Sequence, residues 1–180
     1  MKATGIIRRI DELGRIVIPK EIRRTFKIKV GTPLEIFCGD DGELILKKYS
    51  MITEIKDFAD EVCKSLYNTL SLPVIITDKD KIVSACGIKN IHINSEITTQ
   101  LDKILDNRSS VVKNKLDNDI MISCCGEDIL DYFAQMIVPI IANGDVIGSI
   151  ICFTKEHIKF DNNKLIAIKV MANYLAEQIC

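Results

Sequence analysis

The chain starts with MKATGIIRRIDELGRIVIPKEIRRTFK, which is residues 1–27. Two short runs rich in Ile and Val flank Gly14, and such runs are typical of β-strands. Glycine beside Asp and Glu is typical of a tight turn because it adopts backbone conformations that other residues avoid. We therefore predict strands over 5–10 and 15–18, joined by a turn over 11–14.

A short helix and a hairpin follow these strands. Pro19 suits the start of a helix because the first helical position does not need an N–H group, and we predict the helix over 21–26. Strands are predicted over 33–38 and 43–48, joined by the turn GDDG. Apolar and polar side chains alternate along this hairpin, so one of its faces should be buried.

The first 50 residues are too few to bury a stable core as a single chain. Small domains of this size are often held together by disulfides or zinc, but the seven cysteines of the whole chain show no C-x-x-C spacing and only two histidines accompany them. We therefore expect an obligate dimer in which strands from two chains share one core.

Charge is distributed unevenly along the sequence. Residues 1–50 hold eleven basic and seven acidic side chains, a net charge of +4, whereas residues 51–180 have a net charge of −5. Five of the six arginines lie within residues 8–24, and arginine is well suited to phosphate and guanine recognition. The asymmetry predicts two domains, 1–50 and 51–180, with different partners.

A long motif string in the first domain resembles the AbrB-type transition-state regulators. It comprises MK-x-TGI (1–6), DELGR (11–15), VIP-x-E (17–21), RRT (23–25), LEI (34–36) and ILKKY (45–49). The resemblance implies a swapped-hairpin barrel, mostly β, that is built by two chains and binds DNA.

The resemblance also implies which side chains contact DNA. The main contacts map onto Arg8, Arg15, Arg23 and Arg24, and weaker backbone contacts map onto Lys2, Arg9 and Lys20. The alternative is that these side chains form an ordinary solvated surface. Because no aromatic residue precedes Phe26, there is no stacking platform for single strands, and duplex DNA is the expected partner. We expect contacts mainly to phosphates, with DNA shape adding selectivity.

The second domain is predicted to alternate between helices and strands. We expect a linking helix over 52–70, whose apolar residues suit either helix pairing or packing on its own sheet. Asn143-Gly144 is a strong hairpin signal, and Asp161 is expected to cap a last helix. The remaining predictions are strands over 73–77, 82–86, 119–124, 134–141 and 146–153, and helices over 95–106 and 108–113.

This order describes an antiparallel sheet flanked by helices and resembles a GAF domain, with VPIIANGDVIG (138–148) as the central hairpin. The whole chain is therefore expected to be an α+β protein. The pairing of AbrB-type and GAF-like domains resembles a family of two-domain sporulation regulators, which implies activation and repression of transcription. The same resemblance implies a tetramer built from dimers.

A ligand of the second domain is not identified by the sequence. We find no glycine-rich phosphate loop and predict neither a cofactor nor a metal site, with His92 and His157 in loops. A small-molecule effector stays open, and a pocket lined by Ile75, Thr77 or Met136 is one option, with core packing as the other.

Two alternative functions were weighed. AbrB-type domains also occur in antitoxins, but those usually carry a short disordered tail instead of 130 ordered residues. Some GAF domains reduce oxidised methionine with cysteines, which here would require Cys86 and Cys124 to meet. We expect most cysteines, including Cys124 and Cys125, to be packing residues.

The sequence has features of a cytoplasmic protein associated with the nucleoid. Arg8, Arg9, Asp11 and Glu12 occupy positions where a signal peptide has its apolar core. No apolar run approaches the length of about 18 residues that a membrane helix needs. The helix over 52–70 and the last helix have more apolar surface than one small sheet covers, which predicts a second interface that joins two dimers.

Overall fold

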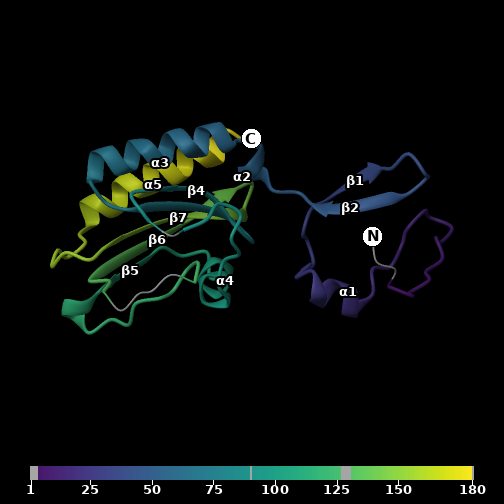
Figure 1. Cartoon of the computed structure of the whole chain (residues 1–180), viewed down its shortest axis with the longest axis horizontal. Coiled ribbons are helices and arrows are strands. Elements are labelled where there is room, and N and C mark those ends of the chain that lie inside the picture. Colours follow the sequence, from purple (N-terminus) through teal and green to yellow (C-terminus); the bar gives the residue numbers. More distant parts are fainter. Residues whose placement is uncertain (1–3, 90, 127–130, 180) are drawn as a thin grey trace. The chain divides into compact units, whose positions relative to one another are not determined.

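The computed structural model describes residues 4–89, 91–126 and 131–179. The chain folds as two units, Met1–Tyr49 and Ser50–Cys180, drawn in purple to blue and in blue to yellow in Figure 1. Each unit has its own secondary structure and is described separately.

The first unit contains one short helix and one hairpin. Helix α1 spans Lys20–Thr25, and strands β1 (Leu34–Cys38) and β2 (Leu44–Lys48) pair antiparallel. The turn between the strands is closed by Gly39 N–H, which donates to the Glu43 carbonyl at 2.8 Å. The predicted helix and hairpin are therefore confirmed, with ends that differ by at most one residue.

The two strands predicted over 5–10 and 15–18 are not formed. Within the described residues 4–19 the chain is irregular apart from a turn at 12–14. Around that turn, Asp11 N–H donates to the Arg15 carbonyl at 3.1 Å and Gly14 N–H to the Asp11 carbonyl at 2.9 Å. A strand exists only through hydrogen bonds to a neighbouring strand, and among the residues described here one chain does not supply that neighbour.

None of the described residues 4–49 is buried. The large apolar side chains of the unit are instead exposed on its segments: Ile6, Ile7, Ile10, Leu13, Ile16, Val17, Phe26, Val30, Ile36, Phe37, Leu44 and Leu46. A folded unit normally removes such side chains from water, since their burial is the main favourable contribution to folding.

The second unit is built on a five-stranded antiparallel sheet. The strands are β3 (Val74–Asp78), β4 (Ile82–Cys86), β5 (Val111–Asn114), β6 (Ala134–Ala142) and β7 (Asp145–Thr154). Their order in the sheet is β4-β3-β7-β6-β5. The long strands β6 and β7 are joined by Asn143-Gly144, both with positive φ, as a two-residue turn of this type requires.

Helices α3 (Lys56–Leu70) and α5 (Asn162–Glu177) cover one face of this sheet (Figure 1). The core on this face includes Val62 and Leu66 of α3 and Ile168 and Leu175 of α5. The predicted apolar positions of the linking helix therefore pack on their own sheet. Asp161 accepts a hydrogen bond from Lys164 N–H at 3.0 Å and caps α5, as predicted.

The linking helix is divided in two, in contrast to the single helix predicted over 52–70. Helix α2 (Met51–Glu54) ends at Ile55, whose φ of −101° and ψ of 32° depart from helical values, and α3 starts at the next residue. The Ser50 side chain accepts the Thr53 N–H at 3.2 Å and caps α2. The break follows a β-branched sequence, which has reduced helix propensity.

Helix α4 (Thr99–Asp106) and long loops lie over the opposite face of the sheet. A second apolar cluster fills this layer, with Leu101 and Leu105 of α4 packed among Ile75, Ile137 and Ile151 of the strands. The unit thus has a sheet in the middle with a separate core on each face.

Two predictions on the α4 side are wrong. The helix predicted over 108–113 is replaced by β5, because Arg108 adopts a φ of +54° that ends the helical path. The strand predicted over 119–124 is not formed. There the Gln135 side chain accepts from Ile122 N–H at 3.0 Å and donates to the Ile122 carbonyl at 2.7 Å, so a side chain takes the place of a neighbouring strand.

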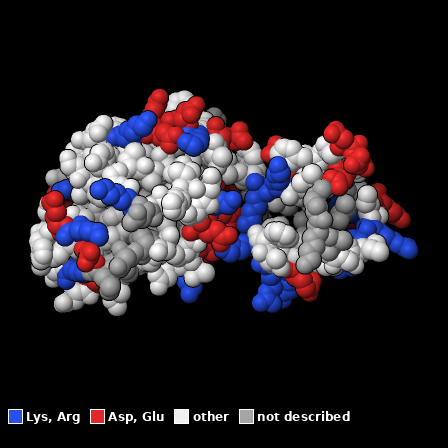
Figure 2. Space-filling view, viewed as in Figure 1, with Lys and Arg blue, Asp and Glu red and all other residues white. Residues whose placement is uncertain are grey.

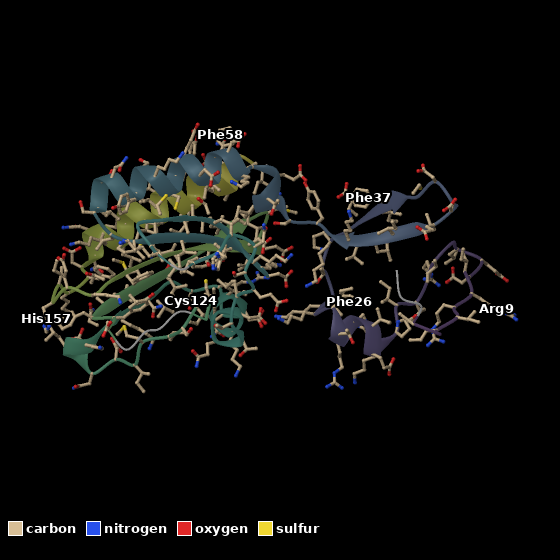
Figure 3. All side chains as sticks on the ribbon, viewed as in Figure 1. Arg9, Phe26, Phe37, Phe58, Cys124 and His157 are labelled. Carbon is tan, nitrogen blue, oxygen red and sulfur yellow. The ribbon has the colours of Figure 1, made fainter. Side chains whose placement is uncertain are left out.

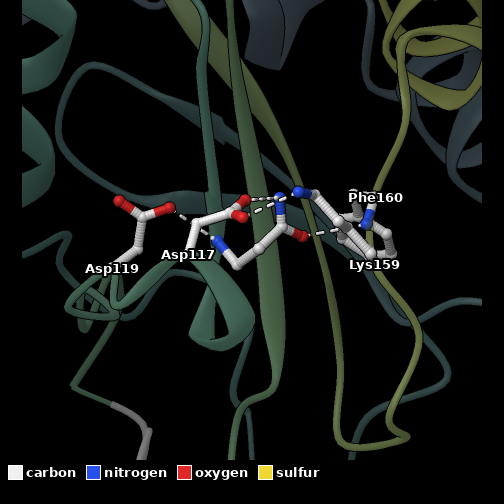
Figure 4. Close-up of polar contacts among 5 residues, drawn as sticks. Asp117, Asp119, Lys159 and Phe160 are labelled. Carbon is white, nitrogen blue, oxygen red and sulfur yellow. Dashed lines mark hydrogen bonds and ion pairs between the residues drawn. The ribbon is translucent and has the colours of Figure 1, made fainter.

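Asn114 at the end of β5 is the centre of a polar network (Figure 4). Its side-chain oxygen accepts from Phe160 N–H at 2.9 Å, and its backbone N–H donates to the Asp119 carboxylate at 2.8 Å. The Asp117 carboxylate accepts a hydrogen bond from Lys159 Nζ at 2.7 Å. These contacts fasten the η1 turn (Lys115–Asp117) to the segment that leads from β7 into α5.

Candidate nucleic-acid interface

The basic side chains singled out by the sequence lie on two segments of the first unit. Arg8 and Arg9 belong to the irregular N-terminal segment, and Arg15 follows the turn at 12–14. Lys20, Arg23 and Arg24 lie on α1. All are exposed except Arg23, which is half-buried, and Lys2 lies outside the described residues.

One chain does not gather these side chains into a single patch on the face in view. Figure 2 shows the Lys and Arg side chains of the first unit in separate groups. Figure 3 shows Arg9 pointing outward, away from α1. The expectation that Arg8, Arg15, Arg23 and Arg24 meet on one surface therefore stays a prediction that involves a second chain.

The turn that carries Arg15 is held by the carboxylate of Asp11. Oδ1 accepts the backbone N–H groups of Leu13 at 3.0 Å and Arg15 at 2.8 Å, and Oδ2 accepts Arg15 Nε at 2.7 Å. Gly14 supplies the φ of +74° that closes the turn. These hydrogen bonds hold the pKa of Asp11 below its ordinary value, and the bond from the Arg15 backbone N–H has the largest effect. The carboxylate is therefore charged at neutral pH.

Sequence reasoning identified the turn and Arg15 but not the link between them. The available signal was an aspartate four residues before an arginine, across a turn that contains glycine. Aspartate is favoured in turns because its side chain accepts nearby backbone N–H groups. A second carboxylate oxygen is then left for a basic partner.

Helix α1 presents the other two arginines. Pro19, with φ of −57° and ψ of 150°, precedes the helix, and Thr25 Oγ1 donates back to the Glu21 carbonyl at 2.9 Å. Beyond the helix, Ile28 N–H donates to the Arg23 carbonyl at 2.7 Å. Both ends of α1 are thus fixed locally, which sets the backbone from which Arg23 and Arg24 project.

Ile75, Thr77 and Met136, which the sequence suggested as the lining of a pocket, do not face one common space in the described part of the second unit. Ile75 and Met136 belong to the two different cores, because their strand positions point to opposite faces of the sheet. Thr77 is fully buried, and its hydroxyl shares a hydrogen bond of 2.7 Å with the Ser149 hydroxyl. Core packing accounts for all three residues.

The thiols also differ from the arrangement that a cysteine enzyme requires. Cys86 packs against the core under α3, whereas Cys124 belongs to the core on the α4 side, so the two do not meet. Instead Cys63, whose thiol points to the Val74 carbonyl at 3.5 Å, lies near Cys86 and Cys152, both paired in register with Val74. Burial raises the pKa of Cys152 to about 12 and also raises that of Cys63.

The histidines of the second unit do not take part in a metal site among the described residues. His92 and His157 lie in loops, as predicted. Across residues 4–89, 91–126 and 131–179, no group of three or more His, Cys, Asp or Glu side chains is arranged to hold a metal ion. In the same ranges, no helix has the length and apolar character to span a membrane.

One known protein resembles the chain over nearly its whole length, and another resembles its first unit. The stage V sporulation protein T of Bacillus subtilis is 44% identical over 180 residues, covering 99% of both chains. The transition state regulatory protein AbrB of the same organism is 59% identical over 49 residues, which is 27% of this chain and 50% of AbrB.

Solved structures resemble the fold of the second unit. A GAF domain of an Acinetobacter phosphoenolpyruvate-protein phosphotransferase matches with a TM-score of 0.59 and 14% identity, over 74% of this chain and 84% of that one. A type II free methionine-R-sulfoxide reductase from Thermoplasma acidophilum matches with a TM-score of 0.57 and 15% identity, over 71% and 94%. At these identities the likeness shows a GAF-like fold alone.

Two family models match the chain and meet at residue 54, five residues beyond the end of the first unit. Residues 7–54 match the model described as antidote-toxin recognition MazE, bacterial antitoxin, and residues 54–180 match the model described as stage V sporulation protein T C-terminal, transcription factor. With its AbrB-like first unit and GAF-like second unit, the chain belongs to the stage V sporulation protein T family of transcription factors.

Proposed function

We propose that the protein binds duplex DNA in a sequence-selective manner and both activates and represses sporulation genes. The observation that carries the proposal is the set of five arginines, four of them exposed and one half-buried, on a unit that has no buried side chain among its described residues. Arg8, Arg15, Arg23 and Arg24 are the main DNA contacts, with Lys2, Arg9 and Lys20 on the backbone. A regulator of this kind acts in the cytoplasm, associated with the nucleoid.

The DNA-binding form is a dimer through residues 1–50. Pairing of two chains buries the exposed apolar side chains of the first unit and gives the extended segments on both sides of the Asp11 turn the strand partners that they lack. The same symmetry doubles the arginine set, so two copies of Arg15 and Arg24 approach one duplex. Half-site spacing in the DNA then reflects the two-fold symmetry of the protein.

A second interface joins two such dimers into a tetramer through the GAF-like units. Helix α5 exposes Ile166, Val170 and Tyr174 at intervals of four residues, with exposed fractions of 58% and 56% for the first two. Phe58 on the neighbouring α3 is also exposed and points outward (Figure 3). Such an apolar stripe suits helix pairing, and two linked DNA-binding faces raise affinity for closely spaced sites.

The GAF-like unit modulates this assembly. An effector that altered the α3–α5 surface would change how the two dimers are held, and hence the DNA affinity, without contact with the arginines.

The two alternative functions are less well supported. An antitoxin role rests on the MazE match over residues 7–54, but the rest of the chain matches the transcription-factor model. A thiol reductase needs a reactive cysteine. Burial raises the pKa of Cys63 and Cys152, which keeps both protonated and weakly nucleophilic.

The salt dependence of DNA affinity tests the proposal. If four arginines from each of two chains approach phosphates, and not all make contact, log K against log salt should have a slope of roughly −4 to −7. Arg15→Ala and Arg24→Ala should each weaken binding strongly while the dimer stays folded, and Arg108→Ala, in the second unit, is the matched control. A slope near zero, or parental affinity in both variants, would contradict the proposed interface.

A further inference from the structure

Asp11 is an acidic residue in the middle of a surface proposed to bind a polyanion. Its side chain is exposed and carries a full negative charge beside Arg15. By charge alone such a residue weakens DNA binding, because a carboxylate repels phosphates. Its hydrogen bonds indicate a different role.

The two carboxylate oxygens of Asp11 have separate tasks. Oδ1 accepts the backbone N–H groups of Leu13 and Arg15, which shapes the turn. Oδ2 accepts Nε of the Arg15 side chain at 2.7 Å, a charge-assisted bond with good geometry. The carboxylate therefore fixes both the backbone of Arg15 and the direction of its guanidinium.

The chemistry of the guanidinium makes this contact compatible with DNA binding. Arginine has five N–H donors in one plane, and a carboxylate that takes Nε–H leaves four donors on the two terminal nitrogens. Those two nitrogens form the fork that recognises guanine or a phosphate in a bidentate manner. A long side chain held at Nε also loses less rotamer freedom when it binds.

We propose that Asp11 is a positioning residue that aims Arg15 and thereby contributes to sequence selectivity. The inference rests on the proposed function, since it assigns a role to Asp11 through a DNA-contacting arginine. Repulsion and positioning predict opposite signs: removal of the charge strengthens all DNA binding under repulsion, whereas it weakens binding to the preferred sequence under positioning.

The variant Asp11→Asn separates the roles of the two carboxylate oxygens. The asparagine oxygen still accepts the N–H groups of Leu13 and Arg15 and keeps the turn, whereas its NH₂ group is a donor and does not accept from Arg15 Nε. Asp11→Ala removes both functions. Asp41→Asn, at an exposed turn position between β1 and β2, removes the same charge from the same unit and is the matched control.

The experiment uses the full chain with two duplexes. One is selected by the parent protein from a random-sequence pool, and the other is a scrambled duplex of the same length and composition. Dissociation constants are measured at one salt concentration for the parent, Asp11→Asn, Arg15→Ala, the double variant and the control. Thermal unfolding and light scattering verify that each variant is folded and assembled.

We expect Asp11→Asn to weaken binding to the selected duplex about two- to fivefold, the upper range for an exposed ion pair. Binding to the scrambled duplex should stay the same or become tighter. In the Arg15→Ala background, Asp11→Asn should have no further effect on either duplex, because there is no guanidinium to aim. The control Asp41→Asn should keep the parental ratio of the two affinities.

The proposal is overturned if Asp11→Asn binds the selected duplex as tightly as the parent, or loses as much affinity with Ala at position 15 as with Arg. A parent protein that binds neither duplex contradicts the proposed function itself. If Asp11→Asn does not fold, Arg15→Lys tests the same contact by changing the arginine instead of the aspartate. It leaves Asp11 and the turn intact but has no Nε–H to be held, so parental selectivity in that variant overturns the proposal as well.

Discussion

The two units of the chain differ in how they treat apolar side chains. In the second unit a sheet carries a core on each face, and the inner residues of β3, β6 and β7 are removed from water. In the first unit, Ile, Leu and Val occur at a similar density along the chain, yet most of them are exposed and no described residue is buried. One unit is complete within a single chain and the other is not.

The comparison shows that sequence hydrophobicity alone does not define a foldable unit. Residues 50–180 are long enough to enclose two layers, whereas about 50 residues bury too little surface without help from a partner. In the proposed dimer, the exposed apolar residues of the first unit are the surfaces that a second copy covers. The proposal therefore couples assembly to DNA binding in the first unit, whereas the second unit encloses its core within one chain.

Removal of core volume from the second unit should have the largest effect on stability. Ile151 is fully buried on the central strand β7, and Ile151→Ala should lower the free energy of unfolding by about 2 to 5 kcal/mol, at any protein concentration. Urea unfolding measures this. Ile120→Ala, at a side chain that is 82% exposed, is the control and should stay within about 0.5 kcal/mol of the parent. Equal effects would contradict the assigned core.

A weaker effect, on a stability that depends on protein concentration, should follow truncation in the first unit. Ile36 on β1 is 64% exposed in a single chain, yet Ile36→Ala should cost about 1 to 3 kcal/mol because its side chain is buried in the dimer. The unfolding midpoints of the parent and the variant should both fall when the protein is diluted, since assembly stabilises the folded state by mass action. Glu35→Gln, at the adjacent position, is the control. A neutral Ile36→Ala at every concentration would speak against the shared core.

The smallest effect should appear at acid pH in the second unit. The Lys164 N–H bond lowers the pKa of Asp161 from its ordinary value of 3.8, and Lys159 does the same for Asp117. Stability from such groups is present above the unfolded pKa and is lost as pH falls through the lower folded pKa. Asp161→Asn keeps a capping oxygen but does not titrate.

Urea unfolding of the Asp161→Asn variant between pH 5 and pH 2 measures that contribution. The variant should lose less stability across this range than the parent. Parallel curves for the two proteins would show that the cap of α5 does not contribute to acid unfolding.

Local rules predicted the elements whose signals lie in neighbouring residues. Asn143-Gly144 gave the central hairpin, Asp161 the cap of α5, and the apolar spacing of the last helix its buried face. Predictions from local sequence were wrong where contacts with residues distant in the sequence determine the structure. The segment at 119–124 pairs with the Gln135 side chain instead of a strand, and nothing near Ile122 in the sequence indicates that partner.

The candidate site shows the same division. The arginines of the first unit were identified from their density and from the family motif, but the tie between Asp11 and Arg15 was not, because a turn alone does not show which way a side chain bends. The strands predicted over 5–10 and 15–18 have a clear local pattern. They lack pairing partners within the described part of one chain, and a local sequence pattern does not form a strand without a neighbouring strand to pair with.

The claim that residues 1–49 have a core only in the presence of a second chain is tested most directly by light scattering and circular dichroism on a fragment of residues 1–52, compared with the full chain. The fragment should be a folded dimer that loses its secondary structure on dilution as it dissociates, and the full chain should be a tetramer. A fragment that stays folded as a monomer at every concentration would contradict the claim.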